Sequence, residues 1–216
     1  LSGLLCLFYM RKKFPILHFQ KGELRLEKHY YKRLLFIGVP MGLQYSITAI
    51  GSVVLQTAVN GLGAAPMAAI TAGQRISGFC CCVFDALGAT MATYAGQNSG
   101  AREYKRIDRG LWDATKIGSI YAVLICILLV LFGGEIPKIF IDGKEREVLA
   151  MTKQFLVANS LFFIPLVFVN CWRFTIQGMG FSGFAMLAGV SEMIARSLVA
   201  FIFIPIFGYI AACYAS

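Results

Sequence analysis

Long runs without charge divide the chain and set the elements that it predicts. Segment 34–74 has no charged residue, and the stretch 60–66 within it has the glycine and proline content of a turn. This turn separates a helix expected over 33–59 from a second one over 66–96. Three further helices are expected from the same pattern, at 115–134, 148–179 and 183–207. Each covers about 20 residues or more, the length that crosses the hydrocarbon core of a bilayer.

Both ends of the chain are also apolar. Residues 1–10 stop at the basic triplet Arg11, Lys12 and Lys13, and residues 208–216 contain no charge. We therefore expect 1–10 to be the end of a transmembrane helix, 11–33 a basic cytoplasmic linker, and 34–216 a transmembrane bundle in which 208–216 starts another helix. The fold class expected is an all-α polytopic membrane protein, with five full transmembrane helices plus two partial ones, as part of a longer protein.

The composition agrees with a lipid environment. Apolar residues make up 58% of the chain and charged residues 14%, and the mean hydropathy is +0.70. Soluble domains carry about 25% charged residues, and disordered chains are polar and charged. Both classes are excluded by these values.

The positive charge follows the predicted topology. The formal net charge is +9, but eight of the 20 Lys and Arg residues lie within 11–33 and five within 102–116. Segment 60–66 has no charge, and 134–147 has three basic and four acidic residues. Since cytoplasmic loops are enriched in Lys and Arg, we expect 11–33 and 98–116 inside and 60–66 and 134–147 outside. The expected partner is the lipid bilayer of the cell membrane rather than nucleic acid.

The motifs of soluble enzymes are absent from the sequence. The seven cysteines form no CxxC pair, and no zinc spacing, P-loop, HExxH or GxSxG motif occurs. We therefore expect no enzyme, no metal site and no cofactor.

Two predicted helices carry polar side chains that could face a solute. The helix at 33–59 has Gly38 and Gly42 in a GxxxG spacing, which permits close helix packing, followed by a small and polar stripe. Packing explains that stripe, and a cavity wall is the functional alternative, with Gln44, Tyr45 and Gln56 as candidates. In the helix at 66–96, Asp85 lies on a face of small residues that we expect to meet other helices. An ionisable residue inside a membrane is by default a functional candidate.

The last two predicted helices add further candidates. Asn170, Arg173 and Gln177 share a face of the helix at 148–179, and we select Asn170 and Gln177 as cavity residues. Glu192 and Arg196 stand at i and i+4 in the order that favours a helical ion pair. The pair is expected to be either a structural pin or part of a conformational switch.

Four segments, in this order, resemble one family. They are Gly38-Val39-Pro40-Met41-Gly42-Leu43-Gln44, then Gln56-Thr57-Ala58-Val59-Asn60-Gly61-Leu62-Gly63, then Ala95-Gly96-Gln97-Asn98-Ser99-Gly100-Ala101 with Arg106 and Gly110, and finally Gln177-Gly178-Met179-Gly180 with Gly189, Glu192 and Arg196. Together they resemble the second, C-terminal six-helix bundle of a MATE (multidrug and toxic compound extrusion) transporter. The third segment is the most specific of the four.

The resemblance implies a fold and an activity. The family has twelve helices in two bundles, so that 1–10 would end helix six and the five full helices would be seven to eleven. It exports organic cations and drug-like molecules in exchange for Na⁺ or H⁺ by alternating access between the bundles. The expected partners are therefore such solutes and the missing N-terminal bundle.

One departure bears on ion coupling. Some members bind the coupling cation through a glutamate in helix seven and an aspartate in helix ten, and these places fall near Thr48 and Leu166 here. The coupling site is then expected in the missing N-terminal half.

The alternative within the superfamily is a flippase for lipid-linked precursors, whose cavity is cationic and for which Arg75, Arg173 and Arg196 are candidates. An integral-membrane enzyme or a non-transporting membrane scaffold is a further alternative.

Overall fold

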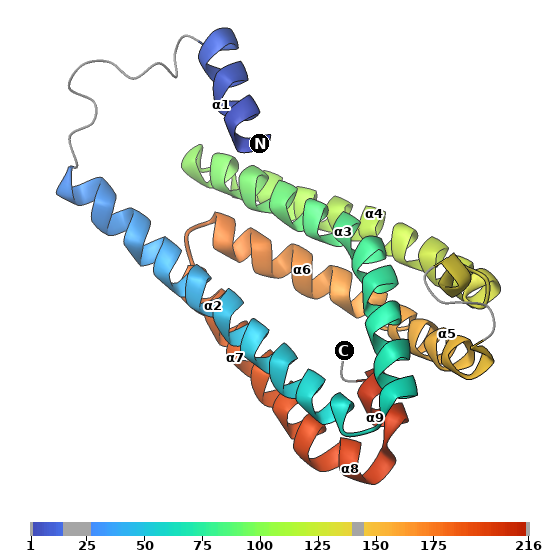
Figure 1. Cartoon of the computed structure of the whole chain (residues 1–216). Coiled ribbons are helices and arrows are strands. Elements are labelled where there is room, and N and C mark those ends of the chain that lie inside the picture. Colours follow the sequence, from blue (N-terminus) through green and yellow to red (C-terminus); the bar gives the residue numbers. More distant parts are fainter. Residues whose placement is uncertain (1, 15–26, 140–144, 215–216) are drawn as a thin grey trace. The chain divides into compact units, whose positions relative to one another are not determined.

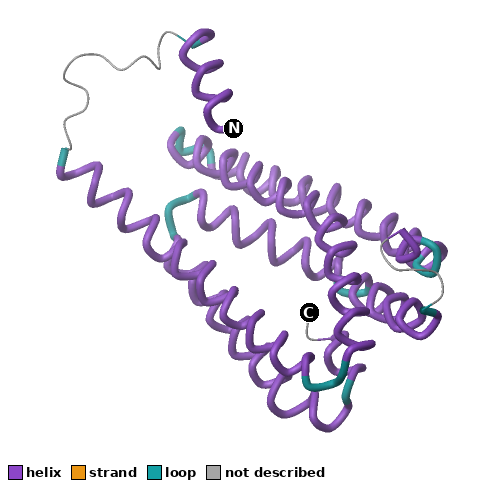
Figure 2. The backbone as a smooth tube through the Cα atoms, in the orientation of Figure 1, coloured by secondary structure: helices purple, strands orange, loops and turns teal. Residues whose placement is uncertain are grey.

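The computed structural model describes residues 2–14, 27–139 and 145–214, and within these ranges it contains helices and no strand (Figures 1 and 2). The α-helices are α1 (Ser2–Lys13), α2 (Lys28–Asn60), α3 (Ala64–Gly100), α4 (Tyr104–Phe132), α5 (Arg146–Ser160), α6 (Phe163–Gly178), α7 (Ser182–Leu198), α8 (Ile204–Phe207) and α9 (Tyr209–Tyr214). A 3₁₀ turn covers Ile136–Ile139, and a π-helical turn covers Val199–Phe203.

Membrane-length helices account for most of the described chain. Helices α2, α3 and α4 and the continuous stretch Ser182–Phe207 are each long and apolar enough to cross a bilayer. Helices α5 and α6 pass the same test together, as one span bent by 50°. This confirms the all-α polytopic membrane fold, and the helix expected over 148–179 is the bent α5–α6 pair.

Two prolines explain where the regular helices are interrupted. Pro165 lies in the first turn of α6, and the α5–α6 break stands just before it. Because proline has no N–H and its ring clashes with the carbonyl four residues earlier, Leu161 cannot continue the helix. The π turn after α7 similarly precedes Pro205, and such turns accommodate a lost backbone hydrogen bond.

The chain divides into two units, residues 1–36 and 37–216. The first unit contains α1 and the first turns of α2. Most of the expected linker 11–33 lies outside the described residues, but Arg11–Lys13 belong to α1 and α2 begins at Lys28. The described parts of that linker are therefore helical, except for Phe14 and Glu27, which lie just outside the two helices.

In the second unit, α3 and α6 form the centre of the bundle (Figure 1). Helix α3 packs on α4, α5 and α6, while α6 also packs on α4 and α7. Small residues allow the two backbones to approach closely, because Gly178 of α6 abuts the backbone of Ala92 and Gly88 of α3 abuts the ring of Phe174. Large buried side chains, among them Phe84 and Phe155, fill the remaining space.

The turn between α3 and α4 is much shorter than the loop expected there. The expected loop 98–116 is reduced to residues 101–103, because α3 ends at Gly100 and α4 begins at Tyr104. Arg102 in this turn adopts a left-handed conformation with φ 61°. The charges of 105–116 lie on the exposed side of α4, whose other side buries Ile107 and Leu111. Of the expected loop 134–147, residues 140–144 lie outside the described residues.

Candidate functional site

The exposed face of α3 is small and polar along its whole length. Residues three or four positions apart form this stripe, and each is exposed: Thr71, Gln74, Gly78, Cys82, Asp85, Ala89, Thr93 and Gln97. Large exposed hydrophobic side chains on α3 are limited to Met67 and Phe79. We call this set of eight residues the α3 polar face.

The neighbouring helix α4 has the opposite character. It exposes Ile120, Leu124, Ile127 and Leu131 among other large apolar side chains, as expected of a helix that contacts acyl chains. Exposed polar groups are costly in hydrocarbon. The α3 polar face is therefore suited to water or to another protein surface rather than to lipid.

Asp85 lies at the middle of the α3 polar face. The sequence predicts that its face meets other helices, but the side chain is exposed within the described part of the chain. The contacts to α6 are made instead by Gly88, Ala92 and Gly96, about one turn or more further along α3. The small residues of α3 therefore serve two sides of the helix, one against α6 and one open.

Gln44 and Gln177 meet where α2 contacts α6. Gln177 Nε2 donates a hydrogen bond of 2.7 Å to Gln44 Oε1, and the two residues are 3% and 9% exposed. The Cγ atom of Gln44 also lies 2.8 Å from the place that a Cβ at Gly189 of α7 would occupy. Three helices therefore converge on Gln44.

Asn170 and Arg173 lie on the same face of α6 as Gln177. Arg173 Nη2 donates to Asn170 Oδ1 at 2.9 Å, and Asn170 is 5% exposed. Within the described chain, Arg173 Nε and Gln177 Oε1 are buried without a hydrogen-bond partner. This face of α6 therefore holds one unused donor and one unused acceptor a single turn apart.

The acid–base pair on α7 connects to α2. Arg196 Nη2 lies 2.8 Å from Glu192 Oε1, and Arg196 Nη1 donates to Ser52 Oγ of α2 at 2.7 Å. The two charged side chains are 24% and 32% exposed. Directly before Ser52, Gly51 lies against the backbone of Met193, where a Cβ would be 3.3 Å from the Met193 Cα. The pair thus spans a close α2–α7 contact.

The remaining candidates on α2 are not part of this network. Tyr45 is 55% exposed, and the half-buried Gln56 donates to Asn60 within the same helix at 3.2 Å. The structure thus brings Gln44 together with Gln177 but leaves Tyr45, Gln56 and Asp85 apart from them.

The polar positions of α3 other than Asp85 were not selected as site residues from the sequence. Their spacing of three to four residues is nevertheless a signal in the sequence: Thr71, Gln74, Thr93 and Gln97.

Thr48 and Leu166, the two places that the resemblance assigns to coupling-cation ligands, carry no carboxylate. Thr48 accepts a hydrogen bond from Ser52 Oγ through its backbone oxygen, and Leu166 packs against the core. Within the described residues, no group of three or more His, Cys, Asp or Glu side chains could hold a metal ion. A hollow of about 550 Å³ between the starts of α3 and α5, lined by Ala64, Ala68 and Glu147 among others, lies at a different place from these polar contacts.

A protein-family model described as MatE matches residues 40–211 of the chain. Two relatives from Bacillus subtilis (strain 168) are similar to it in sequence. "Probable multidrug resistance protein YpnP" is 28% identical over 168 residues, covering 78% of this chain and 36% of the relative. "Probable multidrug resistance protein YoeA" is 25% identical over 154 residues, covering 68% and 32%. The chain spans about a third of the length of these curated relatives.

Solved structures share the fold. One is described as an outward-facing conformation of a multidrug resistance MATE family transporter of the MOP superfamily, with a TM-score of 0.78 and 22% identity. Another is a MOP superfamily transporter from Pyrococcus furiosus, described by a reverse polarity of its binding pocket that suggests a different function, with the same TM-score and identity. The superposition covers 85% of this chain and 41% of each of those chains.

Proposed function

Because the chain belongs to the MatE family, as its match over residues 40–211 shows, we propose that it forms one bundle of an alternating-access transporter. That transporter exports organic cations or drug-like molecules across the cell membrane in exchange for Na⁺ or H⁺. The bundle acts together with the N-terminal bundle of the same protein. No enzymatic step is part of this proposal.

The α3 polar face is the observation that carries the proposal. A membrane-length helix exposes eight small or polar residues in one line, with Asp85 at its middle. Such a face requires water or protein opposite it, and in transporters built of two repeats the substrate site lies between them near the midplane. The α3 polar face then borders the cavity, and Asp85 supplies a negative charge for a cationic solute.

The contacts among α2, α6 and α7 have a different role in this proposal. Gln44 joins α2 to α6, and Arg196 joins α7 to Ser52 of α2. Rocking of two bundles requires that each one move largely as a unit. These buried and half-buried polar contacts hold the three helices together while the bundle moves.

The coupling ion is proposed to bind in the N-terminal bundle. The places near Thr48 and Leu166 have no ionisable side chain, so the described helices lack the carboxylate pair that some members use. A coupling site in this bundle would have to use Asp85 or Glu192. Glu192 is paired with Arg196, which leaves Asp85.

One observation favours the flippase alternative. Arg173 is half-buried in the centre of the fold, and its Nε has no partner in the described chain. A free guanidinium donor suits a phosphate group. Arg75 is exposed, and Arg196 is held by Glu192 and Ser52. Arg173 is thus the one of the three selected arginines with a buried, unused donor atom in the described chain.

A transport assay on the full-length protein separates the two functions. Purified protein is reconstituted into liposomes, an inward or outward Na⁺ or pH gradient is imposed, and uptake of ethidium is followed by fluorescence. We expect gradient-dependent ethidium movement that stops when the gradient is dissipated. Translocation of a fluorescent pyrophosphate-linked lipid without any ethidium movement would instead support the flippase.

A further inference from the structure

One exposed face of α4 changes its chemistry along the helix. In the first turns, residues spaced by four, three and four positions fall in one line and are exposed: Lys105, Arg109, Trp112 and Lys116. These residues span a rise of about 16 Å along the axis. We call this set the α4 basic stripe.

The same line continues with apolar residues. Ile120, Val123, Ile127 and Val130 follow at the same helical spacing and are 63%, 44%, 51% and 45% exposed. An apolar line of this length on a membrane-length helix is suited to acyl chains. The α4 basic stripe therefore lies where the same helix face leaves the hydrocarbon and reaches the lipid headgroups.

The length of α4 agrees with this placement. Its 29 residues span about 43 Å, whereas the hydrocarbon core is about 30 Å thick. About nine residues therefore extend beyond the core. With the apolar line at the C-terminal end of α4, the extension consists of the first turns, which carry Lys105 and Arg109.

An aromatic pair marks the boundary between the two zones. Trp112 of α4 and Trp172 of α6 contact each other edge to face, with ring centroids 6.4 Å apart, and are 47% and 45% exposed. Tryptophan is enriched at the membrane–water interface. The pair places the headgroup level within the α4 basic stripe and shows that α6 contributes to the same surface.

The two outermost basic residues have no acidic partner. Within the described chain, Lys105 and Arg109 take part in no ion pair. Lys116 forms an ion pair with Asp113 at 3.5 Å, in which both side chains are exposed. Exposed pairs of this kind contribute little. The charges of the stripe are thus available to a phosphate group.

We propose that the α4 basic stripe, with Trp172, binds the headgroup of an anionic phospholipid in the leaflet that borders the α3–α4 turn. The Arg109 guanidinium donates two hydrogen bonds to the phosphodiester, a geometry that suits this side chain. Lys105 contacts the same or a neighbouring headgroup, and Lys116, which starts one turn inside the core, reaches the headgroup level by extending its long side chain. Trp112 and Trp172 flank the glycerol region. The acyl chains lie along Ile120 and Val123.

Lipid titration of the full-length protein tests the proposal. Delipidated protein in detergent is titrated with dioleoyl phosphatidylglycerol or dioleoyl phosphatidylcholine, and bound lipids are resolved by native mass spectrometry. Near a membrane surface each Lys or Arg is worth a factor of about five in the binding of anionic lipid. The variant K105Q/R109Q should therefore lose about 25-fold in affinity for its tightest phosphatidylglycerol site and keep its affinity for phosphatidylcholine.

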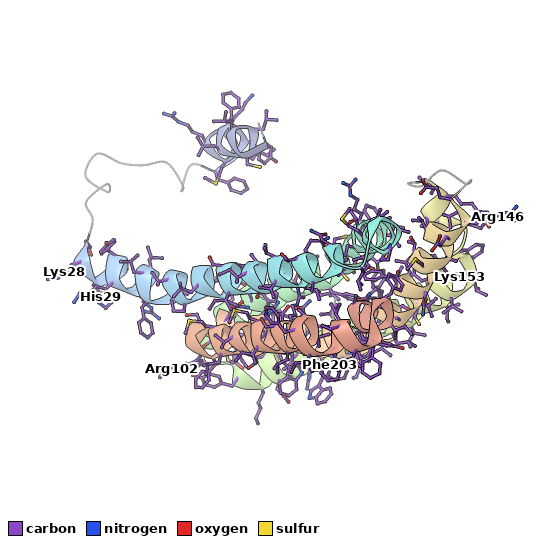
Figure 3. All side chains as sticks on the ribbon, turned by 60° about the horizontal axis from the view of Figure 1, so that its bottom comes forward. Lys28, His29, Arg102, Arg146, Lys153 and Phe203 are labelled. Carbon is purple, nitrogen blue, oxygen red and sulfur yellow. The ribbon has the colours of Figure 1, made fainter. Side chains whose placement is uncertain are left out.

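Two further variants separate a local site from general charge. R146Q/K153Q removes two exposed positive charges from α5, at the other end of the bundle from Arg102 (Figure 3), and should leave the tightest site unchanged. K105R/R109K keeps both charges but moves the guanidinium to position 105, so it should lose less affinity than K105Q/R109Q. The thermal midpoint of each variant is measured as well, and affinities are compared between variants whose midpoint equals that of the wild type. A folding defect is thereby distinguished from a loss of lipid binding.

Two results would overturn the proposal. Equal affinity of the wild type and K105Q/R109Q for phosphatidylglycerol would show that the stripe does not bind the headgroup. An equal loss in R146Q/K153Q would show a response to net charge alone.

Discussion

Gln44 and Gln177 are 133 positions apart in the sequence and share one buried hydrogen bond of 2.7 Å between α2 and α6. Each side chain is nearly excluded from the surface. Gln177 Oε1 has no partner in the described chain, so the Gln177 amide depends on Gln44 for its one contact between helices. The bond therefore reports directly on whether α2 and α6 are held together.

Removal of either glutamine should weaken the α2–α6 contact. Gln44→Leu leaves Gln177 Nε2 without its acceptor, and we expect a loss of about 1 kcal/mol, within the range for interhelical bonds in membranes. The thermal midpoint of the purified full-length protein measures it. Gln177→Leu should cost a similar amount.

The double variant provides the control. Gln44→Leu with Gln177→Leu leaves no orphaned partner, so its cost should be smaller than the sum of the two single costs. Strict additivity would show that the two side chains act independently.

The Glu192–Arg196 pair should stabilise the packing of α7 on α2, and its two members should contribute unequally. Within the described residues, Arg196 contacts both Glu192 and Ser52, whereas Glu192 has one polar contact, its ion pair with Arg196. Each neutral substitution should lower the folded yield, because it leaves one charge unpaired in the membrane. Arg196→Gln should lower it more than Glu192→Gln.

The combined variant Glu192→Gln/Arg196→Gln should recover part of the loss, as measured by the monodisperse fraction in size-exclusion chromatography. A normal yield with altered transport in all three variants would instead assign the pair to a conformational switch.

The close α3–α6 approach depends on Gly178. A Cβ at this position would lie 2.8 Å from the Cα of Ala92 and closer still to its carbonyl oxygen. Since the obstacle is backbone, the helices would have to separate, and Gly178→Ala should destabilise the protein by about 1–3 kcal/mol. The thermal midpoint of the purified full-length protein measures this loss.

Gly183 offers a matched control for this substitution. It lies in α7, and a Cβ added there would meet no other atom within 4 Å. Gly183→Ala should therefore leave the thermal midpoint unchanged or raise it slightly. Equal midpoints for the two variants would show that the α3–α6 contact tolerates expansion.

The number of spans could be predicted from the sequence because charge-free runs are a local property. The start of α4 could not, since Lys105 and Arg109 resemble loop residues until the burial of Ile107 and Leu111 shows an amphipathic helix. The bend before Pro165 follows from a local rule about proline, which the apolar runs alone do not express.

The candidate site shows the same division. The Glu192–Arg196 contact follows from spacing within one helix, and the structure contains it. The Gln44–Gln177 contact depends on how α2 packs on α6, which periodicity does not determine. The small neighbours of Asp85 predict a face against helices, but α3 has small residues on two sides and α6 covers the other one.

The charge distribution predicts which loops are cytoplasmic. Ala101 lies in the turn between α3 and α4, and Ala64 begins α3 at the other end, and both are exposed. Both variants are made in a full-length background without native cysteines. Ala64→Cys should react with an impermeant maleimide in intact cells, whereas Ala101→Cys should react only after the cells are permeabilised. The reverse pattern would invert the topology.

Asp85 gives the sharpest test of the cavity. It is the one carboxylate on the α3 polar face, and its two neighbours on that face, Cys82 and Ala89, are small and leave it exposed. Asp85→Asn keeps the size and the hydrogen-bonding capacity and removes the charge. If the face borders a cavity for cations, gradient-driven ethidium export by the full-length protein should fall about tenfold, as expected for a loss of about 1.4 kcal/mol of attraction, while expression and thermal midpoint stay constant. Asp113→Asn removes an exposed carboxylate near the start of α4 and serves as the matched control, with unchanged export. Equal export by wild type and Asp85→Asn would assign the α3 polar face to contact with another protein surface rather than with solute.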